Sequence, residues 1–324
     1  DPDAALSPDE VYSVTVAVPL LPLRYDSRSF QTIISQLLGS FRGKHHQVKL
    51  SLKVYPLPEF STELSSLVEG SEEDPVVALY ADSTPQFMGE HRLLPVTPFI
   101  EPDVPDYWPV ALDSLRSKNE VWGWPTLLVP ELLLASNRAV QSGLTDEYRQ
   151  LGTGWSPEEF KLFLQSTGTE VPLGLLDTPI PLFSSLVVAA GGSWLPVDEA
   201  GRPLWTAAQV FQAAQLLAEM EQEALLSGPD SPRKGLLPGL QAGSTGAVVG
   251  ANSWLIFQSR QNETAPLQLL PLPTGRTNPV TPVHTVSFAV YRGTEAQGPA
   301  HYRTANELAR FLATEFSVWA AGAG

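Results

Sequence analysis

The order of segments along this chain of 324 residues predicts an α/β fold. The first third alternates strand-like and helix-like periodicity. The later parts carry three sequence signatures that start helices, with strand-like runs between the last two. The hydrophobic share of 43% and the charged share of 17% are those of a globular protein, and the length suffices for about two ordinary domains. We therefore expect α/β domains with large buried cores.

Three strands are predicted in the first third. Residues 12–19, YSVTVAVP, place valine at every second position, as a strand with one buried face does. Residues 48–55, VKLSLKVY, again alternate apolar and polar side chains, and residues 75–80, PVVALY, fit a short buried strand. A helical segment between the first two strands completes a βαβ unit, so the first third should form an α/β lobe.

That helical segment has apolar residues at helical spacing, with Asp26 or Ser27 as its possible cap. Gly39 and Gly43 are expected to break the pattern and end the helix. The apolar residues are Phe30, Ile33, Ile34, Leu37 and Leu38.

Capping boxes predict three later helices. In such a box, a Ser or Thr side chain bonds the backbone N–H three residues on, and the Glu or Gln there bonds back. The boxes are Ser156 to Glu159, with Pro157 at the first helical position, Thr206 to Gln209, and Thr304 to Glu307. The second helix should stop at Gly228 and Pro229 and bury one face, made of Val210, Phe211, Ala214, Leu217 and Leu225.

Composition excludes several classes of function. The 35 acidic and 20 basic residues give a net charge of −15, which repels a phosphate backbone, so nucleic acid is not an expected partner. The absence of cysteine excludes disulfides, thiol catalysis and zinc–thiolate sites. The apolar runs fall short of the roughly 18 to 20 residues that span a bilayer. The start, DPDAALSPDE, lacks an initiator Met, which indicates a mature end or a trimmed chain.

The sequence carries no motif for catalysis or cofactor binding that we can recognise. Residues 39–46, GSFRGKHH, are one residue short of a phosphate-binding loop, and His45 replaces the hydroxyl residue that would hold magnesium. The adjacent His45 and His46 point to different sides of any regular element, which favours a solvated turn over a metal pair. We therefore predict no enzyme activity, no cofactor and no metal.

Several segments stand in an order and spacing that is similar to one known family. They are VVALYADS (76–83), HRLLPVTPFI (91–100), VWGWPTLLVPELLLASNRA (121–139), GWSPEEF (154–160), AAGGSW (189–194), LQAGSTGAVVGANSW (240–254) and PLPTGRTNPVTPVHTVSFAV (271–290). Over about residues 12–319 the chain resembles the family-1 extracellular solute-binding proteins of ABC importers, the group of the maltose-binding type.

The resemblance implies a two-lobed periplasmic binding protein-like fold of type II. Each lobe would be a mostly parallel sheet flanked by helices, with the ligand cleft between the lobes. Lobe 1 would comprise residues 1–121 and 286–324, lobe 2 residues 126–282, and the hinge crossovers residues 122–125 and 283–285. Two lobes joined by extended strands can close around a solute by hinge motion.

The resemblance also implies ligand-binding residues. Tyr80 and Asp82 match the family's aromatic and acid at a strand end, and Trp254 matches the aromatic of its Gly-x-Trp stretch. Aromatic faces stack on apolar ring surfaces such as those of sugars, and a carboxylate accepts hydroxyl hydrogen bonds. Further candidates are Trp122, Trp124, Trp194 and His284, with Phe183 and Asp177 as looser ones. Each aromatic could instead belong to the core, His284 could be a hydrogen-bonded structural residue, and Asp82 could cap the next helix.

The implied function is that of a receptor that captures a small, sugar-like solute and delivers it to the permease subunits of an ABC importer. We expect a monomer in the periplasm or another extracytoplasmic space, with a lipid anchor before residue 1 left open. The alternative is a binding-protein-like sensor or interaction domain that does not transport. The chain departs from larger family members by stopping at AAGAG, and the largely apolar stretch DTPIPLFSSL lacks the charges that mark sugar binders.

Overall fold

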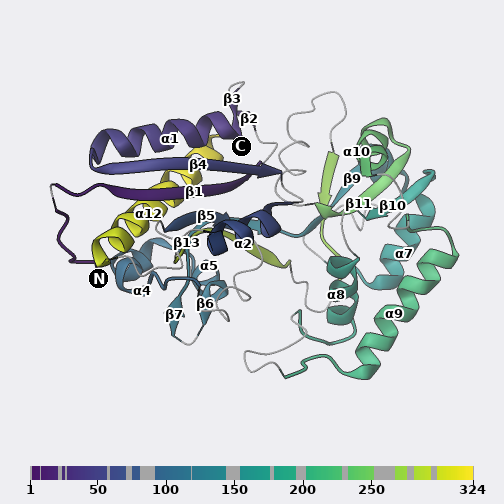
Figure 1. Cartoon of the computed structure of the whole chain (residues 1–324). Helices are drawn as coiled ribbons and strands as arrows, with labels where there is room; N and C mark the ends of the chain where they lie inside the picture. The colour runs from purple at the N-terminus through teal and green to yellow at the C-terminus, as the bar shows by residue number, and fades with distance from the viewer. Residues whose placement is uncertain are drawn as a thin grey trace. The chain divides into compact units, whose positions relative to one another are not determined.

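The computed structural model describes most of the chain in two compact units. Unit 1 comprises Asp1–Val129 and His284–Gly324, and unit 2 comprises Pro130–Val283. The residues described, to which every structural statement below refers, are 2–7, 9–20, 24–25, 28–56, 59–70, 75–80, 92–117, 119–143, 154–175, 179–194, 202–227, 233–251, 267–275, 281–292 and 298–323. The chain therefore crosses from unit 1 to unit 2 after Val129 and returns after Val283 (Figure 1).

Unit 1 is built on a five-stranded sheet of order β4-β1-β5-β13-β8. Its strands are β1 (Tyr12–Leu20), β4 (Val48–Pro56), β5 (Val76–Tyr80), β8 (Trp124–Pro130) and β13 (Val283–Tyr291). Strand β1 runs parallel to β4 and β5, while β13 runs antiparallel to β5. The three strands predicted in the first third are confirmed, and a strand from the end of the chain completes the sheet beside them.

Three long helices pack on this sheet, and shorter elements connect them. The helices are α1 (Phe30–Lys44), α2 (Phe60–Gly70) and α12 (Pro299–Ala323). The short elements are β2 (Arg24–Tyr25), β3 (Arg28–Ser29), α4 (Thr97–Ile100), η2 (Glu101–Asp106), α5 (Pro109–Ser114), β6 (Arg116–Ser117) and β7 (Glu120–Val121). The valines of β1 that were predicted to face inward, Val14, Val16 and Val18, are all buried.

Helix α1 begins and ends differently from the sequence prediction. Its cap is Ser29, whose side chain accepts from the Thr32 N–H at 3.2 Å, rather than Asp26 or Ser27. Gly39 and Gly43 lie inside the helix, which continues to Lys44. The free-energy cost of a glycine inside a helix is smaller than the stabilisation from packing a buried apolar face. Tertiary contacts therefore keep both positions helical.

Helix α12 begins five residues before the predicted box. Pro299 occupies its first position, where a missing N–H costs nothing. Thr304 lies inside the helix, with its hydroxyl donating to the Ala300 carbonyl at 2.9 Å, and Glu307 pairs with Arg303 at 2.7 Å. The predicted capping box at this place was therefore wrong, because its residues have other helical partners one turn earlier.

Unit 2 contains a four-stranded sheet of order β10-β11-β9-β12. Its strands are β9 (Leu132–Ser136), β10 (Val171–Leu175), β11 (Thr245–Ala251) and β12 (Leu267–Leu270), and its helices are α6 (Asn137–Gly143), α7 (Pro157–Ser166), α8 (Ile180–Ala189), α9 (Ala207–Gln222) and α10 (Arg233–Ala242). Strands β10 and β11 are parallel, but β9 is antiparallel to both of its neighbours. Both sheets are thus mixed rather than mostly parallel. The strands that follow a crossing are antiparallel to their described neighbours: β9 to β11 and β12, and β13 to β5.

Two of the three capping boxes are confirmed in unit 2. Ser156 caps α7 and Thr206 caps α9, each with both reciprocal hydrogen bonds in place. The predicted stop of α9 at Gly228 was wrong, since the helix ends at Gln222 and Ala224 turns the chain with φ of 55°. The predicted apolar face was partly wrong: Leu217 packs against the core and Leu225 is buried just after the helix, but Phe211 is 68% exposed, and Ala213 and Met220 are buried instead.

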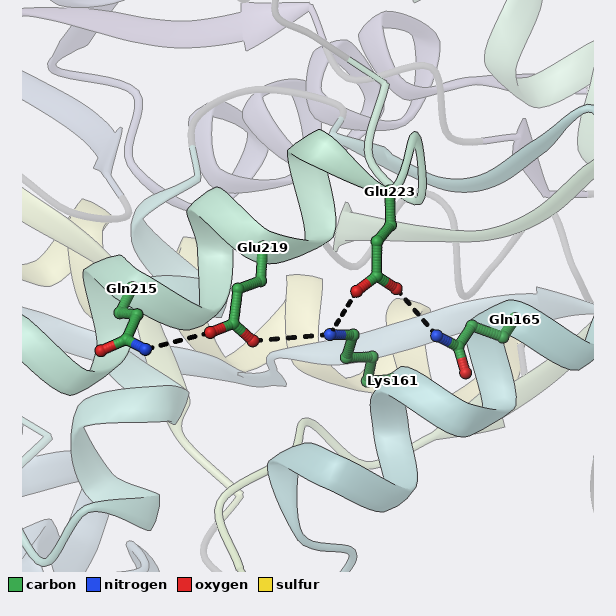
Figure 2. Close-up of polar contacts among 5 residues, drawn as sticks. All are labelled: Lys161, Gln165, Gln215, Glu219 and Glu223. Atoms are coloured by element: carbon green, nitrogen blue, oxygen red, sulfur yellow. Dashed lines mark hydrogen bonds and ion pairs between the residues drawn. The ribbon is translucent and has the colours of Figure 1, made fainter.

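Helices α7 and α9 are joined on their surface by a polar network, shown in Figure 2. The Lys161 ammonium lies 2.6 Å from a Glu223 carboxylate oxygen and 3.4 Å from Glu219. Gln165 donates to Glu223 at 2.8 Å, and Gln215 donates to Glu219 at 3.1 Å. The hydrogen bond from Lys161 is the main cause that lowers the pKa of Glu223, and the same bond raises the pKa of Lys161.

Candidate functional site

In unit 1, the carboxyl ends of the parallel strands meet at one edge of the sheet. The last residue of β1 lies beside the last residue of β4, and Tyr80 ends β5. Because β13 runs the other way, its early residues lie at the same edge, and Ser287 is the register partner of Tyr80. His284 is the second residue of β13. Two candidates that are 204 positions apart in the chain are therefore placed at one edge of one sheet.

The side chains of Tyr80 and His284 are not among those described, so only their backbone places are known. Asp82 follows the end of β5 by two residues and lies outside the described residues. In open α/β sheets, ligands bind outside the carboxyl ends of the strands. The topology therefore makes this edge the place in unit 1 at which polar ligand groups would gather.

The two tryptophans of the first crossing differ in their surroundings. Trp124 is 1% exposed, its indole N–H faces the Asn306 amide oxygen at 3.4 Å, and the Arg310 guanidinium lies 6.0 Å from its ring centre. Its faces and its donor are thus used inside unit 1, in contact with α12. Trp122 is only half-buried, and its indole N–H donates to the Ser117 carbonyl at 3.2 Å. Of the pair, only Trp122 has surface left for a ligand.

Gly123, between these tryptophans, allows a close approach of two strands. A Cβ on Gly123 would lie 2.9 Å from the Ser287 hydroxyl oxygen and 3.4 Å from the Phe288 carbonyl oxygen. The Ser287 hydroxyl itself is buried and has no hydrogen-bond partner among the described residues. An unpaired buried hydroxyl costs free energy, so Ser287 is a polar group at this edge that sequence reasoning missed. No feature of the sequence around Ser287 could have found it, because its pairing with Tyr80 is known only from the register of the sheet.

In unit 2, three aromatic side chains belong to helix α8 or to the segments that follow it. The rings of Phe183 and Trp205 meet edge to face with centres 5.7 Å apart, and the Trp205 indole N–H donates to the Ser193 carbonyl at 2.7 Å. Trp194 follows directly, and all three rings are partly buried against the core of this unit. Trp205 was not among the sequence candidates, although it immediately precedes the Thr206 capping box.

The glycine pair after α8 brings these aromatics together. The N–H of Gly191 bonds the Val188 carbonyl, and the N–H of Gly192 bonds the Val187 carbonyl, each at 2.9 Å. Gly191 has φ of 83°, and a Cβ on Gly192 would lie 2.6 Å from a Val187 methyl carbon and 2.9 Å from its carbonyl oxygen. Only glycine fits both positions, so the pair folds the chain back over the end of α8.

Two further candidates of unit 2 lie outside the described residues. Asp177 comes two residues after the end of β10, and Trp254 comes three residues after the end of β11. Since β10 and β11 are parallel and paired, both candidates follow carboxyl ends at the same edge of the second sheet. Each sheet thus has a carboxyl edge followed by candidate ligand residues.

Within the described residues, neither edge carries the groups of a metal site or a perturbed acid–base pair. No cluster of three or more His, Asp or Glu side chains that could hold a metal is found there. The largest titration shift belongs to Tyr107, whose pKa burial and the nearby Asp103 raise to about 12. Tyr107 directly follows η2 and is not part of a sheet strand. None of the helices in the described part has the length and apolar character to cross a membrane.

No protein-family model matches the chain, and no curated protein matches it. Solved structures do match it. The acarbose-binding GacH receptor of Streptomyces glaucescens aligns with a TM-score of 0.68 at 17% identity, over 95% of this chain and 79% of that one. An ABC transporter solute-binding protein from Thermotoga lettingae, bound with α-D-tagatose, aligns with a TM-score of 0.71 at 13% identity, over 96% and 78%.

A third structure, UgpB from Mycobacterium tuberculosis in complex with glycerophosphocholine, aligns with a TM-score of 0.68 at 17% identity. It covers 86% of this chain and 70% of that one. At such identities the likeness concerns the fold. The chain has the α/β fold of the type II periplasmic binding proteins, as the sequence predicted.

Proposed function

We propose that this protein is a solute-binding receptor that captures a small polar solute and delivers it to the permease of an ABC importer. The observation that carries the proposal is the placement of the candidate residues on a fold of this type. Tyr80 and His284 lie at the carboxyl edge of one sheet, and Trp254 follows the carboxyl end of a strand in the other. Such edges are where α/β sheets hold ligands.

A sugar-like solute suits these side chains best. Tyr80, Trp122, Trp194 and Trp254 would offer flat apolar faces to pyranose-like rings, and the Phe183–Trp205 pair would add a second such surface. Asp82 would accept hydrogen bonds from solute hydroxyls. Two of the three structural neighbours were solved with acarbose and tagatose, and the third with glycerophosphocholine, all of which are polyhydroxylated or derived from a polyol. We leave Trp124 out of this set because it is buried in unit 1.

The capture step would be hinge closure. We propose residues 1–121 with 286–324 as lobe 1, residues 126–282 as lobe 2, and residues 122–125 and 283–285 as the crossovers, although the contacts of residues 126–129 group them with unit 1, so that the passage to unit 2 follows Val129. The N–H of Glu131 donates to the Pro282 carbonyl at 2.9 Å, so the outgoing and returning segments run side by side just after the first crossing. Paired extended segments can flex together while each sheet stays intact.

The place of action would be extracytoplasmic, with the receptor working as a monomer beside its permease. A lipid anchor on a segment preceding residue 1 is compatible with this role. A sensor or interaction domain that binds the same solute without transport is the alternative.

A thermal-shift screen tests the binding function. Mono- and oligosaccharides, polyols, glycerophosphodiesters, amino acids, peptides and oxyanions would each be added to the full chain. A solute at about 100 times its Kd stabilises the folded protein by about 2.7 kcal/mol, which raises the melting temperature by several degrees. If no member of any class shifts the melting temperature, the receptor function fails.

Variants then assign the site. Asp82→Asn and Trp254→Ala should each abolish the shift caused by the identified solute while leaving the melting temperature of the free protein unchanged. The control is Trp108→Ala, because Trp108 is 72% exposed in unit 1 beside α5 and should respond to solute normally. A solute-dependent fall in radius of gyration by X-ray scattering would support closure. Solute binding that never stimulates transport by a reconstituted permease would favour the sensor.

A further inference from the structure

One stretch of this acidic protein contains basic residues and no acidic ones. Between Asp26 and Glu59 the sequence contains no acidic residue, yet it holds five of the chain's 20 basic residues. The stretch therefore carries a formal charge of +5, whereas the whole chain carries −15. It forms helix α1 and strand β4, the outer strand of the unit 1 sheet. Such separation of charge creates a local positive field that net charge alone conceals.

The fold brings three of these five charges to one end of unit 1, while the exposed Lys53 lies further along β4. The Val48 N–H donates to the His45 carbonyl at 3.0 Å, so β4 starts directly where α1 ends. Arg42, Lys44, His46 and Lys49 lie around this turn, and all four are exposed. We call these four residues the basic end. Figure 1 shows it at the end of unit 1 from which β1 and β4 start, opposite the carboxyl edge of their sheet.

The charges of the basic end are not neutralised by ion pairs. Arg42, Lys44 and Lys49 form no ion pair in the described part of the chain, whereas Arg92, Lys161, Arg303 and Arg310 do. Lys44 instead lies 5.8 Å from the centre of the Phe311 ring. In the preceding segment, Glu10 accepts from the Tyr12 hydroxyl and lies 3.9 Å from His301. The basic end is therefore free to meet an anionic partner.

A pocket of about 320 Å³ opens at the basic end. Lys44, His45 and His46 line it on one side, while Leu6 and Val48 add aliphatic wall. Val11, next to this pocket, is 61% exposed. Cationic groups beside exposed aliphatic surface are the combination that suits a lipid headgroup, with phosphate at the ammonium groups and glycerol carbons on the apolar wall.

We propose that the basic end docks unit 1 on an anionic membrane surface. Its cations are spread over a turn and a strand rather than converged on one anion, and lysine acts as a point charge toward many phosphates. Nucleic acid fits less well, since the large aromatics of this stretch, Phe30 and Phe41, are buried and unavailable for base stacking. At physiological salt the screening length is about 8 Å, so the acidic remainder of the protein does not prevent local contact.

Vesicle cosedimentation of the full chain, without solute, tests the proposal independently of the receptor function. We expect binding to vesicles of phosphatidylglycerol and phosphatidylcholine at low salt, release at high salt, and no binding to phosphatidylcholine alone. The double variant Lys44→Glu with Lys49→Glu should weaken binding at least about tenfold, because each lost cation near the surface is worth about fivefold. The matched control is Arg116→Glu with Arg138→Glu, which changes the net charge equally at two exposed sites on β6 and α6 and should bind within about twofold of the parent.

Several results would overturn the proposal. The first is that the protein does not bind anionic vesicles at low salt, and the second is that both double variants lose vesicle binding equally. The third is that inorganic phosphate or glycerol 3-phosphate displaces the protein from the vesicles, which would make the pocket a site for small anions. Equally tight binding to duplex DNA would show unspecific attraction to polyanions. If the reversed charges perturb folding by circular dichroism, Lys44→Gln with Lys49→Gln provides the same test. A lysine on an outer strand also prevents edge-to-edge pairing, so unchanged vesicle binding by this variant would leave Lys49 only that role.

Discussion

The long helices of the two units, α12 and α9, are held in opposite ways. Helix α12 buries a continuous face in unit 1, consisting of Ala305, Leu308, Ala309, Leu312, Ala313 and Phe316. Helix α9 fully buries Ala213 and Met220 in the described part of unit 2, packs Leu216 and Leu217 partly against the same core, and is tied at its surface to α7 through Lys161. One helix thus buries a continuous face, and the other has a narrower buried face together with a cap and surface charges.

This difference shows where a local sequence signal determines the first residue of a helix. The start of α9 follows its capping box, because little tertiary packing competes with the local hydrogen bonds. The start of α12 does not follow its box, because Thr304 is buried inside the helix with its hydroxyl bonded to the Ala300 carbonyl, and a cap contributes only about 1 kcal/mol. The predictions below compare equal chemical changes on the two helices.

The largest effect is expected for Phe316→Ala in α12. Phe316 is fully buried, with ring centres 5.7 Å from Phe30 and 6.3 Å from Phe288. The cavity should lower the free energy of unfolding by about 3 to 5 kcal/mol. Urea titrations followed by circular dichroism measure the loss, and hydrogen exchange should locate it in unit 1. The control is Phe211→Ala in α9, which removes an exposed ring and should stay within about 0.5 kcal/mol of the parent. Similar losses for both would contradict the comparison.

An intermediate effect is expected for Thr206→Ala at the start of α9. The Thr206 side chain accepts from the Gln209 N–H, and its loss should lower the free energy of unfolding by about 1 kcal/mol. The matched change Thr314→Ala lies at an exposed interior position of α12, where Ala has the higher helix propensity. That variant should be neutral or slightly more stable in the same urea titration. Destabilisation by both changes would mean that the box is not what holds α9.

The smallest effect is expected for Lys161→Met, because exposed ion pairs are screened by water and salt. The melting temperature should fall slightly, and by less at high salt. Folding lowers the pKa of Glu223 below its ordinary 4.5, so its share of stability is present above that pH and is lost as the pH falls through the folded value.

The partner titration has the opposite sign. Folding raises the pKa of Lys161 above 10.5, so its share of stability is present below that pH and is lost as the pH rises through the folded value. The difference in melting temperature between parent and variant should therefore be flat near neutral pH and should shrink at both extremes. A difference that does not depend on pH would show that packing of the Lys161 stem, rather than its charge, joins α7 to α9.

The candidate ligand residues show how far a sequence can place a site. The resemblance proposed Tyr80 and His284 as ligand residues without a strand order, and only the pairing of β5 with β13 shows that their backbones lie at one edge. The surroundings of Trp122 and Trp124 could not be told apart, since both are aromatic and two residues apart. Their difference depends on α12, whose Asn306 and Arg310 lie about 180 positions along the chain from Trp124. Trp205 and Ser287 were missed because nothing in their immediate neighbours distinguishes them.

The sequence by itself determined the features that depend on neighbours within a few residues. These are the alternation of β1, the capped starts of α7 and α9, and the glycine pair after α8, each produced by hydrogen bonds or steric limits within one turn. Only the tertiary structure decided that α1 continues past Gly39 and Gly43, which face of α9 is buried, and which tryptophan of the first crossing keeps free surface. Those outcomes depend on burial against segments far away in the chain, and burial of a whole helix face outweighs any single local signal.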